Sequence, residues 1–337
     1  MRFFRLLPRG GLAANHRIFC VKIPSLRILY LLLFLSLTLG SPAQDPSPPP
    51  ALEAQLQRAL ALGMKGKPGS AAVMDVRSGR LLASWELKVS AQRLVAPGST
   101  LKPFFLQELL RLHRISPEQR LICRRPLFIA GRRMDCSHSP EVADLNSSDA
   151  IAYSCNSYFA SVATRLTAQE VADLYHRLGV TSFTGLASSE VHGRVSLAQT
   201  PAQQQLQALG EWGVLITPLE LLSAYRKLAA QRLEAPSAAD PVFLGLEHSV
   251  QYGMAHSAAS MSITAAGKTG TAAGPTTAQT HGLFLGYAPA ERPQIVLMVY
   301  LEQGRGSDAA AIAGPIFAAY AEAAPAAGGR PGRGAAK

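Results

Sequence analysis

The first residues that could take part in catalysis are a serine and a lysine three positions apart, in Ser99-Thr100-Leu101-Lys102. The preceding Pro97-Gly98 predicts a loop that leads into a helix, with Ser99 at the helix N-terminus, where backbone N–H groups favour developing negative charge. Lys102 then lies one turn later on the same face. An amine activates a serine hydroxyl only when it is neutral, so we expect burial or a second cation to lower the pKa of Lys102 from its ordinary value of about 10.4.

Two later segments offer complementary polar groups. Ser154-Cys155-Asn156 places a hydroxyl two residues from a carboxamide, a pair that can relay a proton and contact an amide of a substrate. In Gly267-Lys268-Thr269-Gly270-Thr271, small residues flank an ammonium and two hydroxyls. This composition suits a strand edge along which an extended ligand lies, with its carboxylate against the ammonium. Each motif occurs once, in this order, and the three together are a much stronger signal than any one of them alone.

The elements that must position these motifs can be predicted from periodicity. Leu52, Leu56 and Leu60 indicate an amphipathic helix that Gly63 ends. The segments 71–76 and 81–85 predict a hairpin, 101–228 is mostly helical in pattern, 295–300 suits a buried strand and 309–324 an Ala-rich helix. We therefore predict an α/β (α+β) chain, in which both ends of the body complete one sheet and a helical lobe is inserted between them.

Composition excludes several classes of protein. The chain has 337 residues, of which 48% are hydrophobic and 16% charged, which excludes a disordered or fibrous polymer. Of the formal charge of +11, six units come from residues 1–43 and three from residues 325–337, and neither segment contains an acid. The body is nearly neutral, so we expect no nucleic-acid partner.

The two ends of the chain differ from the body. An apolar run from Ile28 to Leu39 follows the cations, and Gly40-Ser41-Pro42-Ala43 offers a cleavage-like sequence. Residues 1–43 are predicted to be a signal peptide or a short membrane anchor, so the protein would work outside the cytoplasmic membrane, in the periplasm or cell envelope. We assign 44–51 to a Pro-rich linker, 52–324 to one domain and 325–337 to a disordered basic tail.

The three motifs together resemble those of the active-site-serine penicillin-binding proteins, with the signatures SxxK, SxN and KTG. Residues 72–83 are similar to the hairpin that opens the transpeptidase domain of this family, 95–104 to its nucleophile segment and 209–220 to a segment ahead of the third motif. The resemblance covers about residues 68–320. It implies the fold shared with the serine β-lactamases: an antiparallel sheet of the five-stranded type, flanked by helices, with an inserted all-helical lobe.

The resemblance also implies a role for each residue. Ser99 would be the nucleophile that is acylated, and Lys102 its general base, kept neutral partly by the ammonium of Lys268. Ser154 would pass a proton to the departing D-alanine amine, and Asn156 would hold an amide of the substrate. The terminal carboxylate would bind at Lys268, Thr269, Gly270 and Thr271. The backbone N–H groups of Ser99 and Thr271 would form the oxyanion hole.

The implied activity is that of a peptidoglycan D,D-transpeptidase. It would cross-link stem peptides that end in D-Ala-D-Ala, bind β-lactams and need no metal or cofactor, with membrane-bound cell-wall synthesis proteins as partners. Two alternatives stay open. The acyl-enzyme could be hydrolysed, as in a D,D-carboxypeptidase or a serine β-lactamase, although Asn156 argues against the lactamase class whose second motif ends in Val. The domain could instead be a penicillin-binding sensor module that does not turn over.

Two features depart from the family's pattern. Residues 44–70 alone separate the predicted leader from the hairpin, so we expect a minimal, monofunctional member without the additional modules of larger relatives. The segment His281-Gly282-Leu283-Phe284 stands where relatives commonly have a Trp-Phe pair. Substrate contacts at this position therefore need not follow those of the family.

The cysteines allow more than one interpretation. In an exported protein, Cys123 and Cys136 are predicted to form a disulfide, which closes a loop of about 14 residues and is worth about 3 kcal/mol in the chain-entropy model. Free thiols, and a zinc site that includes Asp135 and His138, stay open as alternatives. Cys155, the middle residue of the second motif, is expected to be a buried, unreactive thiol.

Overall fold

The computed structural model describes residues 50–234, 240–273 and 279–324. The predicted leader, residues 44–49 of the predicted linker and the predicted basic tail lie outside the described residues. Helix α2 (Pro50–Met64) includes the last two residues assigned to the linker. Proline is well tolerated in the first turn of a helix, where its missing N–H is not needed. In the described part of the chain, no helix has the length and apolar character required to cross a membrane.

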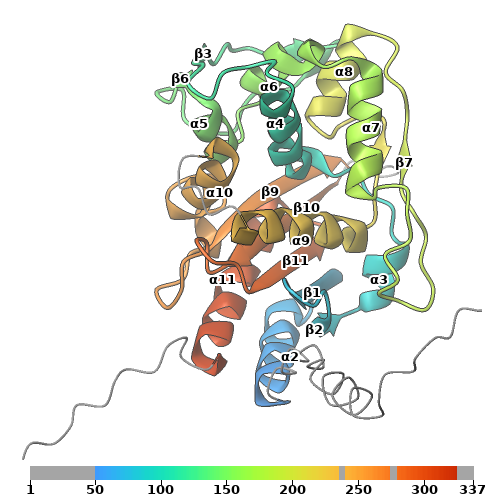
Figure 1. Ribbon diagram of the computed structural model, residues 1–337, viewed down its shortest axis with the longest axis vertical. Coiled ribbons are helices and arrows are strands. Elements are labelled where there is room, and N and C mark those ends of the chain that lie inside the picture. The colour runs from blue at the N-terminus through green and yellow to red at the C-terminus, as the bar shows by residue number, and fades with distance from the viewer. Residues whose placement is uncertain (1–49, 235–239, 274–278, 325–337) are drawn as a thin grey trace, which may run out of the picture. The chain divides into compact units, whose positions relative to one another are not determined.

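A five-stranded antiparallel sheet in the order β2-β1-β11-β10-β9 forms the centre of the fold (Figure 1). Strands β1 (Gly69–Asp75) and β2 (Leu81–Trp85) are the predicted hairpin. The predicted buried strand, β11 (Ile295–Leu301), pairs with β1 on one side and with β10 (Thr280–Ala288) on the other. Strand β9 (Ala266–Ala273) lies at the edge and carries the third motif. Both ends of the body therefore complete one sheet, as predicted.

Helices cover the two faces of this sheet. On one face, α2 and α11 (Gly306–Ala323) bury apolar side chains against β1 and β11. Helix α2 ends at Met64, one residue after the predicted end at Gly63. Gly63 is also a packing position, because a Cβ there would come within 2.8 Å of the Ile312 side chain on α11. The other face packs against α9 (Pro218–Glu234). The two faces use alternate residues of β1, β10 and β11, as the period of two requires.

The inserted lobe is mainly helical, and its helices begin at recognisable caps. Asn146 and Asp149 form a capping box on α5, and Thr167 and Glu170 form one on α7. Three small two-stranded ribbons that the sequence did not predict accompany the helices. The lobe and its connections comprise α3 (Leu87–Gln92), η1 (Gly98–Leu101), α4 (Lys102–Arg111), β3 (Leu121–Ile122), β4 (Phe128–Ile129), β5 (Arg132–Arg133), β6 (Asp144–Leu145), α5 (Ser147–Ala152), α6 (Asn156–Val162), η2 (Ala163–Arg165), α7 (Ala168–Leu178), β7 (Arg194–Val195), α8 (Pro201–Ala208), β8 (Val214–Leu215), α10 (Pro241–Gln251) and η3 (His256–Ala258).

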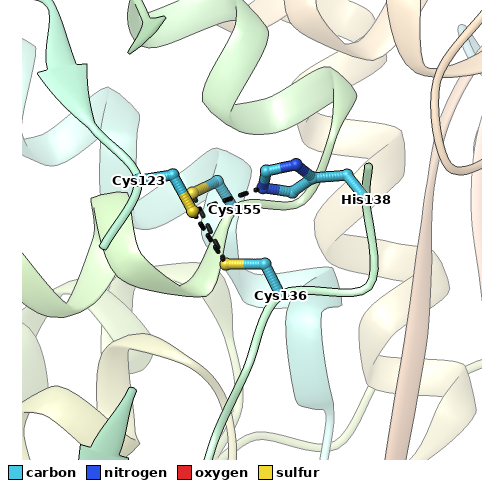
Figure 2. Close-up of side chains that lie close together, drawn as sticks. All are labelled: Cys123, Cys136, His138 and Cys155. Carbon is cyan, nitrogen blue, oxygen red and sulfur yellow. Dashed lines mark hydrogen bonds between the residues drawn. The ribbon is translucent and has the colours of Figure 1, made fainter. Parts of the chain in front are cut away.

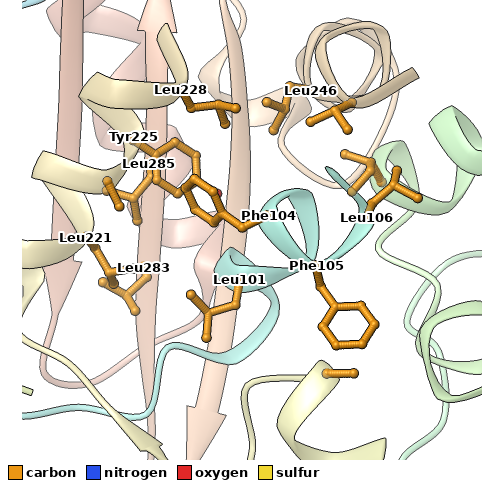
Figure 3. Packing of buried hydrophobic residues seen from close by; sticks show 14 of the residues in the cluster. Leu101, Phe104, Phe105, Leu106, Leu221, Tyr225, Leu228, Leu246, Leu283 and Leu285 are labelled. Atoms are coloured by element: carbon orange, nitrogen blue, oxygen red, sulfur yellow. The ribbon is translucent and has the colours of Figure 1, made fainter. Parts of the chain in front are cut away.

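Helix α4 joins the lobe to the sheet. Figure 3 shows Phe104 between the sheet and α9, with its ring against Tyr225, and Phe105 on another side of α4. The rings of Phe104 and Tyr225 meet edge to face, with centroids 5.1 Å apart. Burial of an aromatic side chain of this size contributes about 1.5–3 kcal/mol. This packing fixes the helix whose first residue is Lys102.

Candidate active site

Ser99 lies on η1, a 3₁₀ turn that continues directly into α4. The backbone before it is unusually compact. Gly98 has φ +53°, and its N–H donates to the carbonyl of Gly210 at 3.0 Å. Gly210 approaches so closely that a Cβ on it would lie 2.1 Å from the Gly98 oxygen. Tyr225 completes the support, because its hydroxyl donates to the carbonyl of Thr100 at 2.8 Å. Ser99 therefore stands on a rigid turn at the start of a helix, as predicted.

Lys102 is fully buried directly after this turn. Its ammonium donates to the carbonyl of Ser154 at 2.8 Å and to Oδ1 of Asn156 at 2.6 Å, and lies 3.3 Å from the Ser154 hydroxyl. Burial lowers the pKa of Lys102 to about 8. Burial, one of the two causes that we expected, is thus the main cause, whereas the expected contribution of Lys268 is not among the causes of this shift. In the other direction, burial and then the charge of Lys102 lower the pKa of Lys268.

The second motif forms a strained turn before α6. Ser154 has φ +53°, a left-handed conformation that is uncommon for a residue with a side chain. The carboxamide of Asn156 is occupied on both sides: its oxygen accepts from Lys102, and its Nδ2 donates to the carbonyls of Met134 at 3.0 Å and Asp135 at 3.4 Å. In this geometry Asn156 positions the amine of Lys102 through its oxygen.

The third motif lies along edge strand β9, as predicted. Lys268 is fully buried, and its ammonium donates to the carbonyl of Thr269 at 3.1 Å. The hydroxyl oxygen of Thr271 accepts the N–H of Gly306 at 2.9 Å. A hydroxyl that accepts in this way keeps its own proton for another partner. Thr271 is therefore held with a donor available to an anionic group.

Gly270 lets β9 come close to the turn that carries Ser99, residues 98–101, which we call the nucleophile turn. A Cβ at Gly270 would lie 2.7 Å from the methyl group of Thr100 and 2.8 Å from the carbonyl oxygen of Pro97. A Cβ at Gly98 would lie 3.0–3.3 Å from the backbone N, C and O atoms of Thr271. The backbones of the nucleophile turn and of β9 therefore run side by side, which is the arrangement that an oxyanion hole between Ser99 and Thr271 requires.

These segments enclose one small cavity of about 110 Å³. Its walls include five of the predicted site residues: Ser99, Ser154, Asn156, Thr269 and Thr271. Lys102 and Lys268 are buried beside it. The structure thus brings together three motifs that lie more than 50 residues apart from one another in sequence.

Glu211 also lines this cavity and was not identified from the sequence. Its side chain is 14% exposed and lies 3.3 Å from the guanidinium of Arg132. Burial raises the pKa of Glu211, and Arg132 opposes this shift. The residue directly follows Gly210 in a segment that the resemblance did mark, but no spacing pattern indicated that its carboxyl group reaches the site.

His281, the departure from the family's pattern, contacts the loop that precedes Ser99. Its side chain is buried, and Nε2 donates to the carbonyl of Ala96 at 2.7 Å. The ring also packs against Tyr300, with centroids 5.9 Å apart. Burial lowers the pKa of His281. The His281 side chain therefore stabilises the loop that leads to Ser99.

The predicted disulfide is absent from the structure. The sulfur atoms of Cys123 and Cys136 lie 3.6 Å apart and are not bonded. Cys155 is buried, as predicted, and its sulfur lies 3.6 Å from that of Cys136. Asp135 does not join them, because its carboxylate accepts the Leu127 N–H at 2.7 Å and the Arg133 guanidinium at 2.6 Å. Cys123, Cys136 and Cys155 are therefore free thiols in the structure, which was one of the alternatives left open.

Comparisons with known proteins agree with this geometry. The family model described as the penicillin binding protein transpeptidase domain matches residues 69–322. No curated protein sequence matches the chain.

Three of the similar solved structures illustrate the likeness. The transpeptidase domain of penicillin-binding protein 3 from Burkholderia pseudomallei has 22% identity and a TM-score of 0.71, with 84% of this chain and 96% of that one covered. A peptidoglycan glycosyltransferase from Burkholderia ambifaria has 22% identity and a TM-score of 0.68, with coverages of 80% and 93%. The D,D-transpeptidase domain of a peptidoglycan glycosyltransferase from Eggerthella lenta has 20% identity and a TM-score of 0.69, with coverages of 80% and 81%. These likenesses confirm the predicted fold.

Proposed function

The chain belongs to the penicillin-binding protein transpeptidase domain family, and on this basis we propose that it is a serine D,D-transpeptidase of peptidoglycan. The enzyme forms an acyl-enzyme at Ser99 with stem peptides that end in D-Ala-D-Ala and transfers the acyl group to an amine acceptor. β-Lactams acylate the same serine. The observation that carries the proposal is the buried amine of Lys102, which two groups of the second motif hold beside the cavity that Ser99 lines.

The reaction begins with a proton transfer. Neutral Lys102 takes the proton of Ser99 as Oγ attacks the carbonyl carbon of the penultimate D-alanine. The oxyanion is stabilised by the N–H groups of Ser99 and Thr271, whose backbones run side by side. As the C–N bond breaks, the Ser154 hydroxyl, 3.3 Å from the Lys102 amine, passes a proton to the departing D-alanine. An acceptor amine then attacks the ester, and its proton returns through the same groups to Ser99.

The third motif binds the terminal carboxylate of the substrate. The hydroxyl of Thr271 supports this role, because its oxygen accepts the N–H of Gly306 and its own proton is left to donate to the carboxylate. Thr269 lines the same cavity, and the buried ammonium of Lys268 supplies the opposite charge. Gly270 lets this strand approach the nucleophile turn without a steric clash.

The proposal can be tested with a synthetic peptide that ends in D-Ala-D-Ala, incubated with the full chain in the presence and absence of a D-amino acid as acceptor. A transpeptidase exchanges the terminal residue for the acceptor, and mass spectrometry detects the new peptide. Release of D-alanine without exchange would instead identify a carboxypeptidase. Acylation by penicillin without turnover of any peptide would favour the sensor module.

Hydrolysis is the second candidate, and Glu211 is the observation that favours it. A carboxylate at the cavity wall can activate a water molecule against the acyl ester. Replacement Glu211→Gln keeps the shape and removes the base. If hydrolysis is the natural outcome, the penicillin adduct on this variant persists roughly 100-fold longer than on the unmodified chain. Equal adduct lifetimes would mean that Glu211 does not activate the water molecule, and would support transfer as the natural outcome.

The cell envelope is the place where we propose that the enzyme works. The support is the sequence of residues 1–43, which predicts export or a short anchor. Membrane-bound cell-wall synthesis proteins would bring the domain to its substrate. Fusion of residues 1–70 to a reporter that is active only after export tests the first statement: an inactive reporter would contradict it.

A further inference from the structure

A cluster of three thiols and one imidazole lies beside the second motif and has no role in the proposed reaction. Figure 2 shows Cys123, Cys136, His138 and Cys155 converging on one point from three segments of the chain, with Cys136 and His138 on the same loop. One ligand-type atom from each of the four side chains lies within 4.8 Å of all the others. Cys136, His138 and Cys155 are buried, and Cys123 is partly buried. We propose that this cluster binds a structural zinc ion.

The distances fit a tetrahedral zinc site. The Cys136 sulfur lies 3.6 Å from the sulfur of Cys123 and 3.6 Å from that of Cys155. Nε2 of His138 lies 3.8 Å from the Cys123 sulfur. Zn–S bonds of about 2.3 Å and a Zn–N bond of about 2.0 Å at tetrahedral angles place neighbouring ligand atoms about 3.5–3.8 Å apart. A disulfide would need two sulfurs at about 2.05 Å and would leave the third thiol and the imidazole unused.

The groups around the cluster also favour a metal–thiolate centre. The Ser157 N–H donates to the Cys136 sulfur at 3.4 Å, and the Tyr158 N–H to the Cys155 sulfur at 3.4 Å. Such bonds stabilise thiolates. Nδ1 of His138 faces the carbonyl of Ser139 at 3.0 Å and the guanidinium of Arg125 at 2.9 Å, so Nε2 is the ring nitrogen that faces the cysteine sulfurs.

Charge favours the same occupant. Three thiolates and one Zn²⁺ carry a net charge of about −1. The guanidinium of Arg125 lies beside the cluster, 2.9 Å from Nδ1 of His138, and donates to the His138 carbonyl at 2.8 Å. A cation at this position offsets the charge of the bound centre. Tetrahedral sulfur and imidazole ligation selects zinc over magnesium or calcium, which prefer oxygen ligands.

Four protein ligands close such a site, so the ion would be structural and would not bind substrate. Its position connects it to the candidate active site. Cys155 stands between Ser154 and Asn156, and Cys136 follows the two carbonyls of residues 134 and 135 that hold the Asn156 carboxamide. Zinc would therefore fix the loop and the turn between which Asn156 is held, and through Asn156 the amine of Lys102. This last link rests on the proposed function, whereas metal binding itself does not.

Metal content tests the site directly. The full chain is purified without a metal-binding tag, and its zinc is measured by mass spectrometry of the element. We expect about one zinc per chain and, after exchange with Co²⁺, the visible absorption bands of tetrahedral thiolate-bound cobalt. Replacement Cys123→Ser should lower the zinc content at least about tenfold. The matched control is Asp135→Asn, which changes a neighbouring carboxylate outside the cluster and should keep the zinc.

Three results would overturn the proposal. The first is folded unmodified chain that binds neither zinc nor cobalt, with circular dichroism confirming the fold. The second is an intact mass two hydrogens lower with a Cys123–Cys136 cross-link in the digest. The third is full zinc content in a folded Cys123→Ser variant. None of these three results is measured with penicillin or a substrate peptide, so each one stands whether or not the proposed function is correct. If zinc supports Asn156, its removal should also slow acylation by penicillin roughly tenfold.

Discussion

Replacement Lys102→Arg should abolish the fast reaction of the chain with penicillin. The amine of Lys102 is fully buried, and its pKa is lowered to about 8. At pH 7 such a group is neutral in roughly one molecule in ten, about 250 times more often than a lysine with the ordinary pKa of about 10.4. An arginine stays charged at every pH of the assay, with a pKa above about 12. It can neither take the proton of Ser99 nor fit the two short contacts of the amine.

The assay is the rate of acylation by a fluorescent penicillin between pH 6 and pH 9. Because the neutral amine is the active form, the rate on the unmodified chain should rise with pH and level off above about 8. The Lys102→Arg variant should be slower by about 10²–10⁴-fold at pH 8. Lys65→Arg is the matched control, since Lys65 is exposed directly after α2, and its rate should not change.

Two outcomes would refute this reasoning. A rate that is independent of pH across this range, or that falls as pH rises, would mean that Lys102 is not the group that accepts the proton. A folded Lys102→Arg variant that reacts at more than about half the normal rate would mean the same. Thermal unfolding of the variant, followed by circular dichroism, separates loss of chemistry from loss of the fold.

Further predictions concern the supports of the site. Replacement Gly210→Ala should lower the free energy of unfolding in urea by more than about 3 kcal/mol, because the new Cβ would lie 2.1 Å from the carbonyl oxygen of Gly98. The control Gly66→Ala has a similar φ but no atom within 4 Å of the new Cβ, and should cost only about 1–2 kcal/mol. Equal losses in the two variants would refute the steric argument. Replacement Thr271→Val should slow acylation at least tenfold through loss of the hydroxyl donor, whereas Thr271→Ser should stay near normal; an active valine variant would contradict the carboxylate site.

Short-range features of the fold could be predicted from the sequence because each depends on neighbouring residues. The hairpin of β1 and β2 follows from two apolar segments around a turn, and β11 from a run of β-branched residues. Ser99 could be placed at a helix start because Pro-Gly precedes it. The end of α2 was predicted to within one residue, but the packing role of Gly63 was not, since the helix that approaches it lies about 250 residues later in the chain.

Long-range features of the site could be predicted only in part. The three motifs identified the residues of the cavity, but not that Asn156 is held on both sides, since one partner is a backbone carbonyl of a distant loop. Glu211 and the place of Cys155 in the thiol cluster were missed for the same physical reason. A carboxyl group or a thiol acquires its neighbours from tertiary contacts, and spacing within one segment does not encode them. The pair Cys136 and His138, two residues apart, was the one local signal for the cluster.

The most direct test of the central claim is the site of covalent attachment. The full chain is incubated with a penicillin, digested, and the modified peptide is sequenced by mass spectrometry. We expect one adduct, on Ser99, and no adduct on the folded Ser99→Ala variant. An adduct on another residue, or no adduct on folded chain, would contradict the assignment of Ser99 as the nucleophile.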